Sequence, residues 1–554
     1  MNLIQAEDDL AFIPLGGTGE IGLNLNVYRC DGQLLAVDCG LGFGGNDNPE
    51  AEVMVPDPSW LADRRDKLVG LVITHAHEDH IGAIAPLWPQ LRCPIYASPF
   101  TAAVLRRKLG EAGLMGQVKL VTVPLGGSME LGPFGVRFIR VTHSVPEPQS
   151  IAITTRYGTV LHTGDWKLDP DPLIGQPADE EAFAALGREG VLAMICDSTN
   201  ALVEGHSGSE ADVRRSMTAL LRQIKGRVAV TCFATNVARV ESISVAARAA
   251  GRQVALFGRS LRNAEAAARE CGYLQDVPAF LSEDEADDVP DDQLLIICTG
   301  SQGEPRSAMA KIAADTHPRI SLGEGDTVIF SSRMIPGNEK AILRMQDELA
   351  RGGCRVMTAD DHMVHVSGHP ARDELKKLYS LVKPRFAVPV HGEWRHLQEH
   401  AALARQMGST PILVDDGDVL RLAPLSGNTR PEVVEGVVTG QLVVDGDRLL
   451  PLDGPVIAAR RKMLFNGVVV ASLAVDRDGH VLSTPQLSAP GLFEMGDLEP
   501  GQIADELARA ITDLPAPLRE ADDLLRDAAR TALRKSVSRR LRKRPSVEVH
   551  ILRV

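Results

Sequence analysis

The segment His75-Ala-His-Glu-Asp-His80 constrains this chain more than any other, because it places four potential metal ligands within six residues. His75 and His77 lie two residues apart, so in extended backbone their side chains point the same way. Asp79 and His80 can then turn toward a second ion. Imidazole suits zinc or a similar transition metal, and carboxylate suits a harder or shared position, so this segment predicts a metal site.

The flanking residues indicate where this site lies in the fold. Residues 68–73 form an apolar run that predicts a buried strand, and residues 81–87 predict the start of a helix. The ligands are therefore expected in a strand-to-helix loop, where side chains converge on a cleft. Further potential ligands or partners stand at the ends of other strand-like runs: Asp38, His143, Asp165 and His391.

A lone histidine or aspartate at a strand end is more often structural, but these residues in this order resemble the metallo-β-lactamase superfamily of two-metal hydrolases. The resemblance implies that Asp165 bridges two ions. It assigns His75, His77 and His143 to the first ion, and Asp79, His80 and His391 to the second. Asp38 is then expected to orient a ligand histidine, or alternatively only to cap its strand.

The interval between Asp165 and His391 is long enough to hold a whole additional domain. Asp197, His369 and His391 resemble the signature of the β-CASP nucleases, which carry a domain inserted at this place. Members of that group that act on RNA typically have histidine at the position of His391, so the resemblance favours RNA over DNA.

Five longer segments narrow the resemblance to the bacterial ribonuclease J family, and it covers essentially the whole chain. They are Asp197-Ser-Thr-Asn-Ala201, Cys298-Thr-Gly-Ser-Gln-Gly-Glu-Pro305, Met334-Ile-Pro-Gly-Asn-Glu339, His365-Val-Ser-Gly-His369 and Pro389-Val-His-Gly-Glu393. Ala76 stands where glycine is common and Ser207 where threonine is common, and neither change removes a ligand. The C-terminal region matches more loosely.

This resemblance implies a 5′-to-3′ exoribonuclease that prefers 5′-monophosphorylated RNA and also cleaves internally, in RNA maturation and decay. The expected cofactors are two divalent metal ions, zinc first, with manganese or magnesium as alternatives. The expected partner is single-stranded RNA, such as mRNA and rRNA precursors. A homodimer or homotetramer is also expected.

The resemblance further implies roles for individual residues. Asp79, His369 and Asp197 are the expected catalytic residues: His369 supplies a proton to the departing 3′ oxygen, and Asp197 fixes its tautomer. A purely structural His369 is the alternative. The 5′ phosphate is expected at the turn formed by His365, Val366, Ser367, Gly368 and His369, and Phe43 is a candidate for stacking on a base.

Strand-like and helix-like segments predict an α/β protein in three parts. Residues 1–209 and 365–450 are expected to form a metallo-β-lactamase αββα sandwich, and residues 210–364 a doubly wound β-CASP domain with parallel strands. Its strand ends at 258–260, 299–303 and 331–333 are candidate RNA contacts or ordinary turns. Residues 451–554 predict a small α/β domain with helices near 503–514 and 517–541.

Composition excludes several other classes. With 554 residues and 44% hydrophobic residues the chain is long enough for several domains, and no apolar run reaches the length of a membrane span. The eight cysteines form no C-x-x-C pair, which indicates reduced thiols and no thiolate zinc site. The N-terminus lacks the order of a signal peptide, so a cytoplasmic protein that does not contact membranes is expected.

The formal net charge of -14 runs against binding to a polyanion. Metal ions would neutralise part of the acidic count, and residues 534–544 are strongly basic, although that run is equally well explained as a solvated helix face. The glycine-rich segment 16–22 resembles a dinucleotide fingerprint. No clear helix is predicted after it, so we interpret it as a loop on the floor of the active site.

Two other functions remain open at this point. A small-molecule metallo-hydrolase, acting on a thioester or a lactam, explains the metal ligands but leaves the insertion and the His369 region without a purpose. A non-catalytic RNA-binding relative predicts that ligands are lost, and none is lost.

Overall fold

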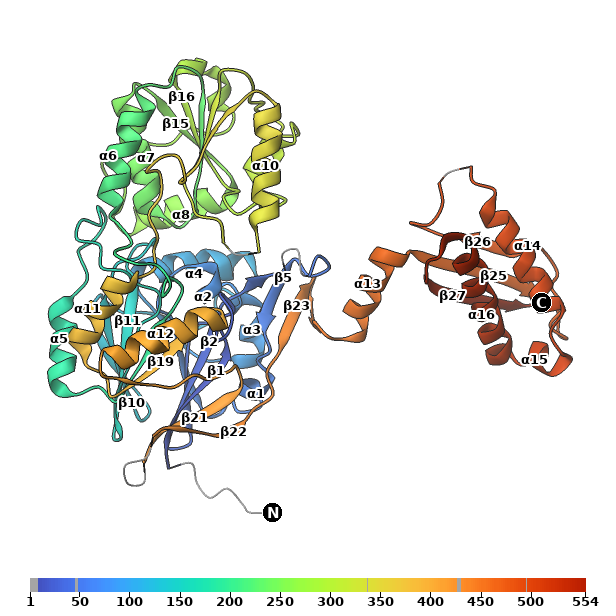
Figure 1. Cartoon of the computed structure of the whole chain (residues 1–554), viewed down its shortest axis with the longest axis horizontal. Coiled ribbons are helices and arrows are strands. Elements are labelled where there is room, and N and C mark those ends of the chain that lie inside the picture. Colours follow the sequence, from blue (N-terminus) through green and yellow to red (C-terminus); the bar gives the residue numbers. More distant parts are fainter. Residues whose placement is uncertain (1–7, 45–47, 336, 426–429, 495) are drawn as a thin grey trace. The chain divides into compact units, whose positions relative to one another are not determined.

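The computed structural model describes residues 8–44, 48–335, 337–425, 430–494 and 496–554 (Figure 1). The chain divides after Val444 into two compact units. The first unit contains the sandwich and the inserted domain, and the second contains the C-terminal region.

The first layer of the sandwich is an eight-stranded sheet with the order β22-β21-β1-β2-β3-β6-β7-β8. These strands are β1 (Leu10–Gly16), β2 (Leu25–Cys30), β3 (Gln33–Val37), β6 (Leu68–Val72), β7 (Ile95–Ala97), β8 (Leu120–Thr122), β21 (Asp418–Ala423) and β22 (Glu432–Gly436). Helix α4 (Pro99–Glu111) packs on β7 and β8. Helices α1 (Ser59–Ala62) and α3 (Ile84–Leu91) contact each other.

The second layer is a seven-stranded sheet with the order β20-β19-β13-β12-β11-β10-β9. Its strands are β9 (Ser128–Leu131), β10 (Phe134–Arg140), β11 (Gln149–Thr155), β12 (Gly158–His162), β13 (Ala193–Asp197), β19 (Phe386–Val390) and β20 (Thr410–Pro411). Because β19 pairs in parallel with β13, the chain returns to this sheet after the insertion, as the sequence predicts.

Two apolar clusters hold these layers together. Side chains from the inner faces of both sheets, such as Phe12 and Phe138, form one cluster. The other lies on the outer face of the second sheet, where Leu378 and Leu403 of α11 (Arg372–Val382) and α12 (Trp394–Gln406) pack beside Phe183 of α5 (Glu180–Glu189). This helix–sheet–sheet–helix arrangement confirms the predicted αββα sandwich.

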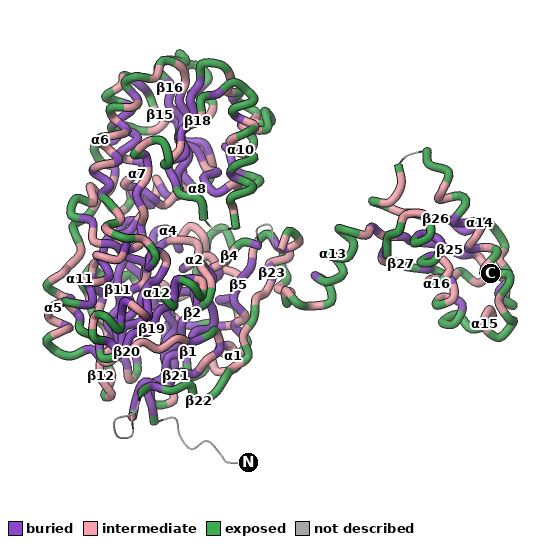
Figure 2. Tube along the Cα trace, in the orientation of Figure 1, coloured by how far each residue is buried: buried purple, intermediate pink, exposed green. Residues whose placement is uncertain are grey.

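The inserted domain contains a parallel five-stranded sheet with the order β15-β16-β14-β17-β18. Its strands are β14 (Val228–Thr231), β15 (Gln253–Phe257), β16 (Leu294–Cys298), β17 (Thr327–Phe330) and β18 (Arg355–Met357). One face packs against α9 (Ala308–Ala313) and α10 (Glu339–Arg351), and the other against α6 (Glu210–Leu221), α7 (Val237–Ala249) and α8 (Arg259–Glu270). The predicted doubly wound sheet is confirmed, and Figure 2 shows its strands buried between these helices.

A smaller sheet lies beside the sandwich, where β5 (Val53–Pro56) pairs with β4 (Gly42–Phe43) and with β23 (Gln441–Asp445). Two 3-10 turns, η1 (Glu285–Asp288) and η2 (Asp291–Gln293), precede β16. None of the helices in the described ranges combines the length and the apolarity that a bilayer span requires.

The second unit contains β24 (Arg448–Pro451), α13 (Pro455–Asn466), β25 (Val468–Val475), β26 (Gln486–Ser488), α14 (Glu499–Thr512), α15 (Ala516–Glu520), α16 (Asp522–Leu541) and β27 (Ser546–Arg553). Its sheet has the order β26-β25-β27, and α14 and α16 share an apolar cluster with it. The predicted single helix over 517–541 was wrong, because Ala521 is extended and separates two helices. The predicted domain boundaries after residues 209, 364 and 450 stay predictions.

Candidate active site

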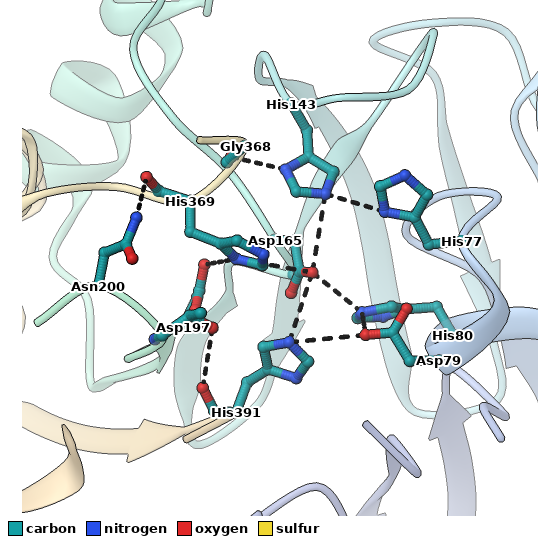
Figure 3. A network of polar contacts seen from close by, with 12 residues as sticks. His77, Asp79, His80, His143, Asp165, Asp197, Asn200, Gly368, His369 and His391 are labelled. Carbon is teal, nitrogen blue, oxygen red and sulfur yellow. Dashed lines mark hydrogen bonds and ion pairs between the residues drawn. The ribbon is translucent and has the colours of Figure 1, made fainter. Parts of the chain in front are cut away.

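Three histidine rings, those of His75, His77 and His143, converge beyond the ends of β6 and β10. Figure 3 shows two of them, His77 and His143. The Nε2 atoms of His75 and His143 lie 3.1 Å and 3.0 Å from Nδ1 of His77. Oδ2 of Asp165, which follows β12, lies 3.8 Å from the Nε2 atoms of both His75 and His143. Three ring nitrogens and a carboxylate oxygen thus face one point, as in a tetrahedral metal site.

A second group of ligands shares the same Asp165 oxygen. Asp165 Oδ2 lies 3.2 Å from Nε2 of His80 and 3.5 Å from Nε2 of His391. Asp79 Oδ2 lies 3.5 Å from the first of these nitrogens and 3.7 Å from the second. All seven residues predicted as ligands are therefore brought together, with Asp165 common to both groups.

The local backbone differs from the expected loop. Helix α2 (Glu78–Ile81) begins directly after His77, so Asp79 and His80 lie in its first turn, and a second helix, α3, starts only at Ile84. The helix predicted to start within residues 81–87 is present, but helical structure begins earlier, at Glu78, and is interrupted between Ile81 and Ile84. At the end of β19, His391 adopts a left-handed backbone with φ of 52°, a conformation that non-glycine residues adopt only under constraint.

Hydrogen bonds on the far side of the rings fix their tautomers. Nδ1–H of His80 donates to Oδ2 of Asp38 at 2.7 Å. Thr74 Oγ1 donates its single proton to the same carboxylate oxygen at 2.8 Å. In its contact with Nδ1 of His75 at 3.0 Å it must therefore be the acceptor, so Nδ1 of His75 carries the hydrogen. One carboxylate thereby orients a histidine of each group and turns both Nε2 lone pairs toward the site.

Two further rings, those of His143 and His391, are oriented by distant segments, whereas Nε2 of His77 has no hydrogen-bond partner among the described residues. Nδ1–H of His143 donates to the carbonyl oxygen of Gly368 at 2.6 Å, and Nδ1–H of His391 donates to Oδ1 of Asn24 at 3.1 Å. The turn predicted to hold a phosphate therefore also orients His143, a predicted metal ligand.

Asp197 and His369 form a pair beside the ligands. Asp197 Oδ2 accepts from Nδ1–H of His369 at 2.9 Å, and the His369 ring lies with its centroid 5.0 Å from that of His143. Burial lowers the pKa of His369, but the carboxylates of Asp197 and Asp165 outweigh it and raise that pKa to about 9. The imidazole is held in one orientation and favours its protonated form.

Ser367 lies at the centre of the turn between His365 and His369. Its Oγ accepts from Nδ2 of Asn200 at 2.8 Å and from the backbone N–H of His369 at 3.2 Å. A hydroxyl has two acceptor positions and one donor, so the Ser367 O–H stays available to donate to a ligand.

The neighbours of Ser367 are closely packed. Val366 is buried against Gly208, and a Cβ on Gly368 would lie 2.6 Å from Cε1 of His143. Arg239 donates to Nδ1 of His365 at 3.3 Å, and burial followed by that guanidinium lowers the pKa of His365 well below its usual range. His365 is therefore a neutral ring at the base of the turn.

Family models match the chain in four consecutive segments. They are the metallo-beta-lactamase superfamily at residues 26–231, the ribonuclease J beta-CASP domain at 225–349, the Zn-dependent metallo-hydrolase RNA specificity domain at 355–414 and the ribonuclease J C-terminal domain at 455–554. Ribonuclease J of Sinorhizobium meliloti is 42% identical to this chain, over 99% of this chain and 98% of its own length. This chain belongs to the ribonuclease J family.

Other relatives agree with this family. Ribonuclease J of Mycolicibacterium smegmatis is 39% identical over 99% of this chain and 98% of its own length, and that of Thermus thermophilus is 36% identical over 90% and 87%. A crystal structure of a protein of unknown function from Enterococcus faecalis V583 covers 74% of this chain and 100% of its own, with a TM-score of 0.51. Because the two sequences are only 15% identical, this similarity is evidence for the fold and for nothing further.

The donor set of this ribonuclease J family member fits divalent metal ions. Burial lowers the pKa of His77 to about 4, and lowers the pKa values of His75 and His143 well below their usual range, so these rings are neutral donors. Nε2 of His391 is buried and has no hydrogen-bond partner among the described residues. A buried lone pair that faces two carboxylates is the partner a cation requires.

Three residues of the site were not predicted from the sequence: Asn24, Thr74 and Asn200. Asn24 and Thr74 stand beside motifs, and the sequence gives no signal that separates them from ordinary turn chemistry. Asn200 lies within the segment Asp197–Ala201, so the resemblance marks its position but does not indicate its role. Gly17, in the predicted glycine loop, accepts the His391 N–H at its carbonyl oxygen at 2.7 Å, which agrees with a loop at the active-site floor.

The base contact predicted at Phe43 stays a prediction. Phe43 is 55% exposed, and its neighbour Leu41 donates its N–H to the carbonyl of Glu78 at 3.0 Å, so this segment runs beside α2. A second aromatic ring, Phe233, has its centroid 6.4 Å from that of His77. The predicted contacts at 258–260, 299–303 and 331–333 follow β15, β16 and β17 and stay predictions.

Proposed function

We propose that this protein degrades single-stranded RNA from the 5′ end, prefers a 5′ monophosphate, and also cleaves RNA internally. Membership of the ribonuclease J family makes it a metal-dependent ribonuclease. The observation that carries the finer proposal is the bond from His143 to Gly368, because it joins the predicted phosphate turn directly to a metal ligand.

The residues that would hold two divalent ions are His75, His77 and His143 for one, Asp79, His80 and His391 for the other, and Asp165 for both. Nitrogen-rich ligands favour zinc, and manganese or magnesium are the alternatives. When bound, the two ions supply Lewis acidity that activates water and offsets the charge of the phosphodiester.

The side chains of this protein would then direct the protons. Asp79, which is the most exposed of the three carboxylates beside His80, would take the proton that the attacking water loses. As water adds to phosphorus and the bond to the 3′ oxygen breaks, protonated His369 donates its Nε2 proton to that oxygen. Asp197 keeps Nδ1–H occupied, so only Nε2 can act.

The turn from His365 to His369 would bind the 5′ phosphate of the RNA. The Ser367 O–H is left free to donate by the two hydrogen bonds that its oxygen already accepts. This turn offers one free hydroxyl donor and directly contacts His143, a proposed metal ligand. We therefore expect it to bind a monophosphate better than a triphosphate. The Asp197–His369 pair and this turn, which lie on either side of the inserted domain in the chain, have a role in RNA cleavage that a small-molecule hydrolase would not need.

One assay tests these proposals together. The zinc-loaded protein is incubated with 5′-monophosphorylated RNA, 5′-triphosphorylated RNA, circular single-stranded RNA and a thioester. We expect the fastest exonucleolytic decay for the monophosphate, slower decay for the triphosphate, cleavage of the circle, and no thioester hydrolysis. Ser367→Ala should make the first two rates alike. Equal rates in the unmodified protein would contradict the role of the turn.

We also propose a cytoplasmic homodimer or homotetramer that acts on mRNA and on rRNA precursors. Light scattering of the purified full-length chain tests the oligomeric state, and RNA crosslinking in cells tests the substrates. A monomer at cellular concentration would contradict the first part.

A further inference from the structure

A buried ion pair of the inserted domain lies behind the turn from His365 to His369. Arg239, in the first turn of α7, donates from Nε and Nη2 to the two carboxylate oxygens of Glu210, the first residue of α6, at 3.0 Å and 2.8 Å. Both side chains are almost fully shielded from solvent. Two parallel hydrogen bonds fix the orientation of a guanidinium as well as its charge.

The third nitrogen of this guanidinium faces the start of the turn. Nη1 of Arg239 shares its two hydrogens among four acceptors. These are the carbonyl of Val364 at 3.1 Å, Nδ1 of His365 at 3.3 Å, and Oγ and the carbonyl of Ser331 at 2.8 Å and 2.9 Å. Oγ of Ser331 in turn donates to the carbonyl of Val364 at 2.7 Å. Arg239 and Ser331 together hold the backbone that enters the turn.

The contact with Arg239 decides which nitrogen of His365 carries the hydrogen. A guanidinium has no acceptor, so Nδ1 of His365, which faces it, must offer its lone pair, and the hydrogen of the neutral ring is then on Nε2. Burial, followed by the charge of Arg239, lowers the pKa of His365 well below its usual range and keeps the ring neutral. The ring can therefore donate one hydrogen bond, from Nε2.

A second buried ion pair fixes the position of Glu210. The backbone N–H of Glu210 donates to Oδ2 of Asp169 at 2.9 Å, and the same oxygen pairs with Nζ of Lys167 at 3.1 Å. Lys167 and Asp169 closely follow Asp165, the carboxylate common to both proposed groups of ligands. The two pairs form a continuous buried connection from the segment of Asp165 to His365.

We propose that Arg239 is the positioning residue of the turn that binds the 5′ phosphate, and that it orients His365 so that Nε2–H donates to this phosphate beside the Ser367 O–H. This inference rests on the proposed function of the turn. An arginine suits the position because two of its nitrogens bind Glu210 while the third reaches the turn, whereas the ammonium of a lysine is a single point of charge.

The test compares Arg239→Lys, which keeps the positive charge, with the unmodified full-length, zinc-loaded protein. Values of kcat and KM are measured on RNA with a 5′ monophosphate and with a 5′ hydroxyl, and cleavage of circular RNA reports the chemistry without a 5′ end. We expect kcat/KM on the monophosphate to fall by about 10–100-fold, mainly through a higher KM, as for a lost hydrogen bond to a charged group. Cleavage of the other two substrates should fall far less.

Arg252→Lys is the matched control. Arg252 is also a buried arginine of the inserted domain, but it donates to the carbonyls of Ile224, Gly226 and Leu294 near the opposite ends of the strands. It should lower the melting temperature as Arg239→Lys does, and keep the preference for the monophosphate. An unchanged preference in Arg239→Lys, an equal loss on circular RNA, or the same loss of preference in Arg252→Lys would each overturn the proposal.

A second variant covers the case in which Arg239→Lys does not fold. Glu210→Gln keeps the size of the side chain but removes the charge that holds the guanidinium. It should reduce the preference for the monophosphate by about tenfold, since the orientation of Arg239 is loosened. An unchanged ratio in this variant would then overturn the proposal.

The tautomer of His365 is a readout that does not depend on nuclease activity. In ¹⁵N spectra of histidine-labelled protein, the His365 signal is the one absent from His365→Gln, and it should show the hydrogen on Nε2. A hydrogen on Nδ1 would overturn this inference alone. Equal rates of the unmodified protein on RNA with either 5′ end would instead contradict the proposed function of the turn, so the two failures are distinguishable.

Discussion

His369 can separate the proposed chemistry from metal binding by experiment, because Asp197 holds its ring and it lies outside both proposed groups of ligands. His369→Ala should keep both metal ions and most RNA affinity. Single-turnover cleavage should fall by roughly 10²–10⁴-fold, the usual contribution of a positioned general acid. Metal content, RNA binding and cleavage are measured on the same preparation.

The control for this variant is Asp197→Asn, which keeps the size of the side chain but weakens the orientation of the ring. It should reduce cleavage less than His369→Ala does. Loss of a metal ion from His369→Ala would mean that the histidine is a ligand, and full activity would mean that it is only structural.

Thr74 is a residue whose hydroxyl alone carries its role. It links Asp38 to His75 through one donated and one accepted hydrogen bond. Thr74→Val should lower metal affinity by about 10–100-fold, because the tautomer of His75 is no longer fixed. Thr74→Ser retains the hydroxyl and should bind metal nearly as the unmodified protein does. Equal metal affinity in the two variants would rule out this link.

At the scale of elements, the turn between β18 and α11 would link the proposed phosphate site to a proposed metal ligand. Gly368 contributes its carbonyl to His143 and has no room for a side chain, since a Cβ would lie 2.6 Å from that ring. Gly368→Ala should therefore reduce both the preference for a 5′ monophosphate and the metal content. Gly436→Ala, at a glycine with open space around it, is the control and should change neither.

Cleavage assays with both 5′ ends and metal analysis check this prediction. A Gly368→Ala protein that loses the 5′ preference but keeps full metal content would show that the turn and His143 are independent.

At the scale of the whole molecule, the proposed metal ligands come from both sheets of the sandwich. They follow β6 in the first sheet and β10, β12 and β19 in the second, all within the unit that ends at Val444. Removing the metal should abolish cleavage and lower the melting temperature of this unit, because ions that bind only the folded state stabilise it. Zinc or manganese should restore both.

Calorimetry of the full-length chain checks this prediction through its separate transitions. The unit formed by residues 445–554 contains none of the proposed ligands, so its transition is the internal control and should not move. Cleavage of RNA by a thoroughly metal-free preparation would contradict the two-metal site.

Much of this arrangement could be predicted because the signals are local. The apolar run before His75 and the alternation in the inserted domain reflect burial of strands on both faces, and a strand end predicts where a ligand can leave the sheet. Helix ends were less predictable. The start of α2 at Glu78 and the break at Ala521 depend on backbone angles that hydrophobic periodicity does not encode.

The sequence by itself determined the kinds and the order of the ligands, the parallel sheet of the insertion and the resemblance that names the family, because these reside in residue type and spacing. Only the tertiary structure decided which groups orient those ligands and which charges meet. Gly368 reaches His143 across 225 residues, and Thr18 reaches Asp416 across 398. Such contacts depend on how strands from distant segments pair, and no local pattern in the chain records that pairing.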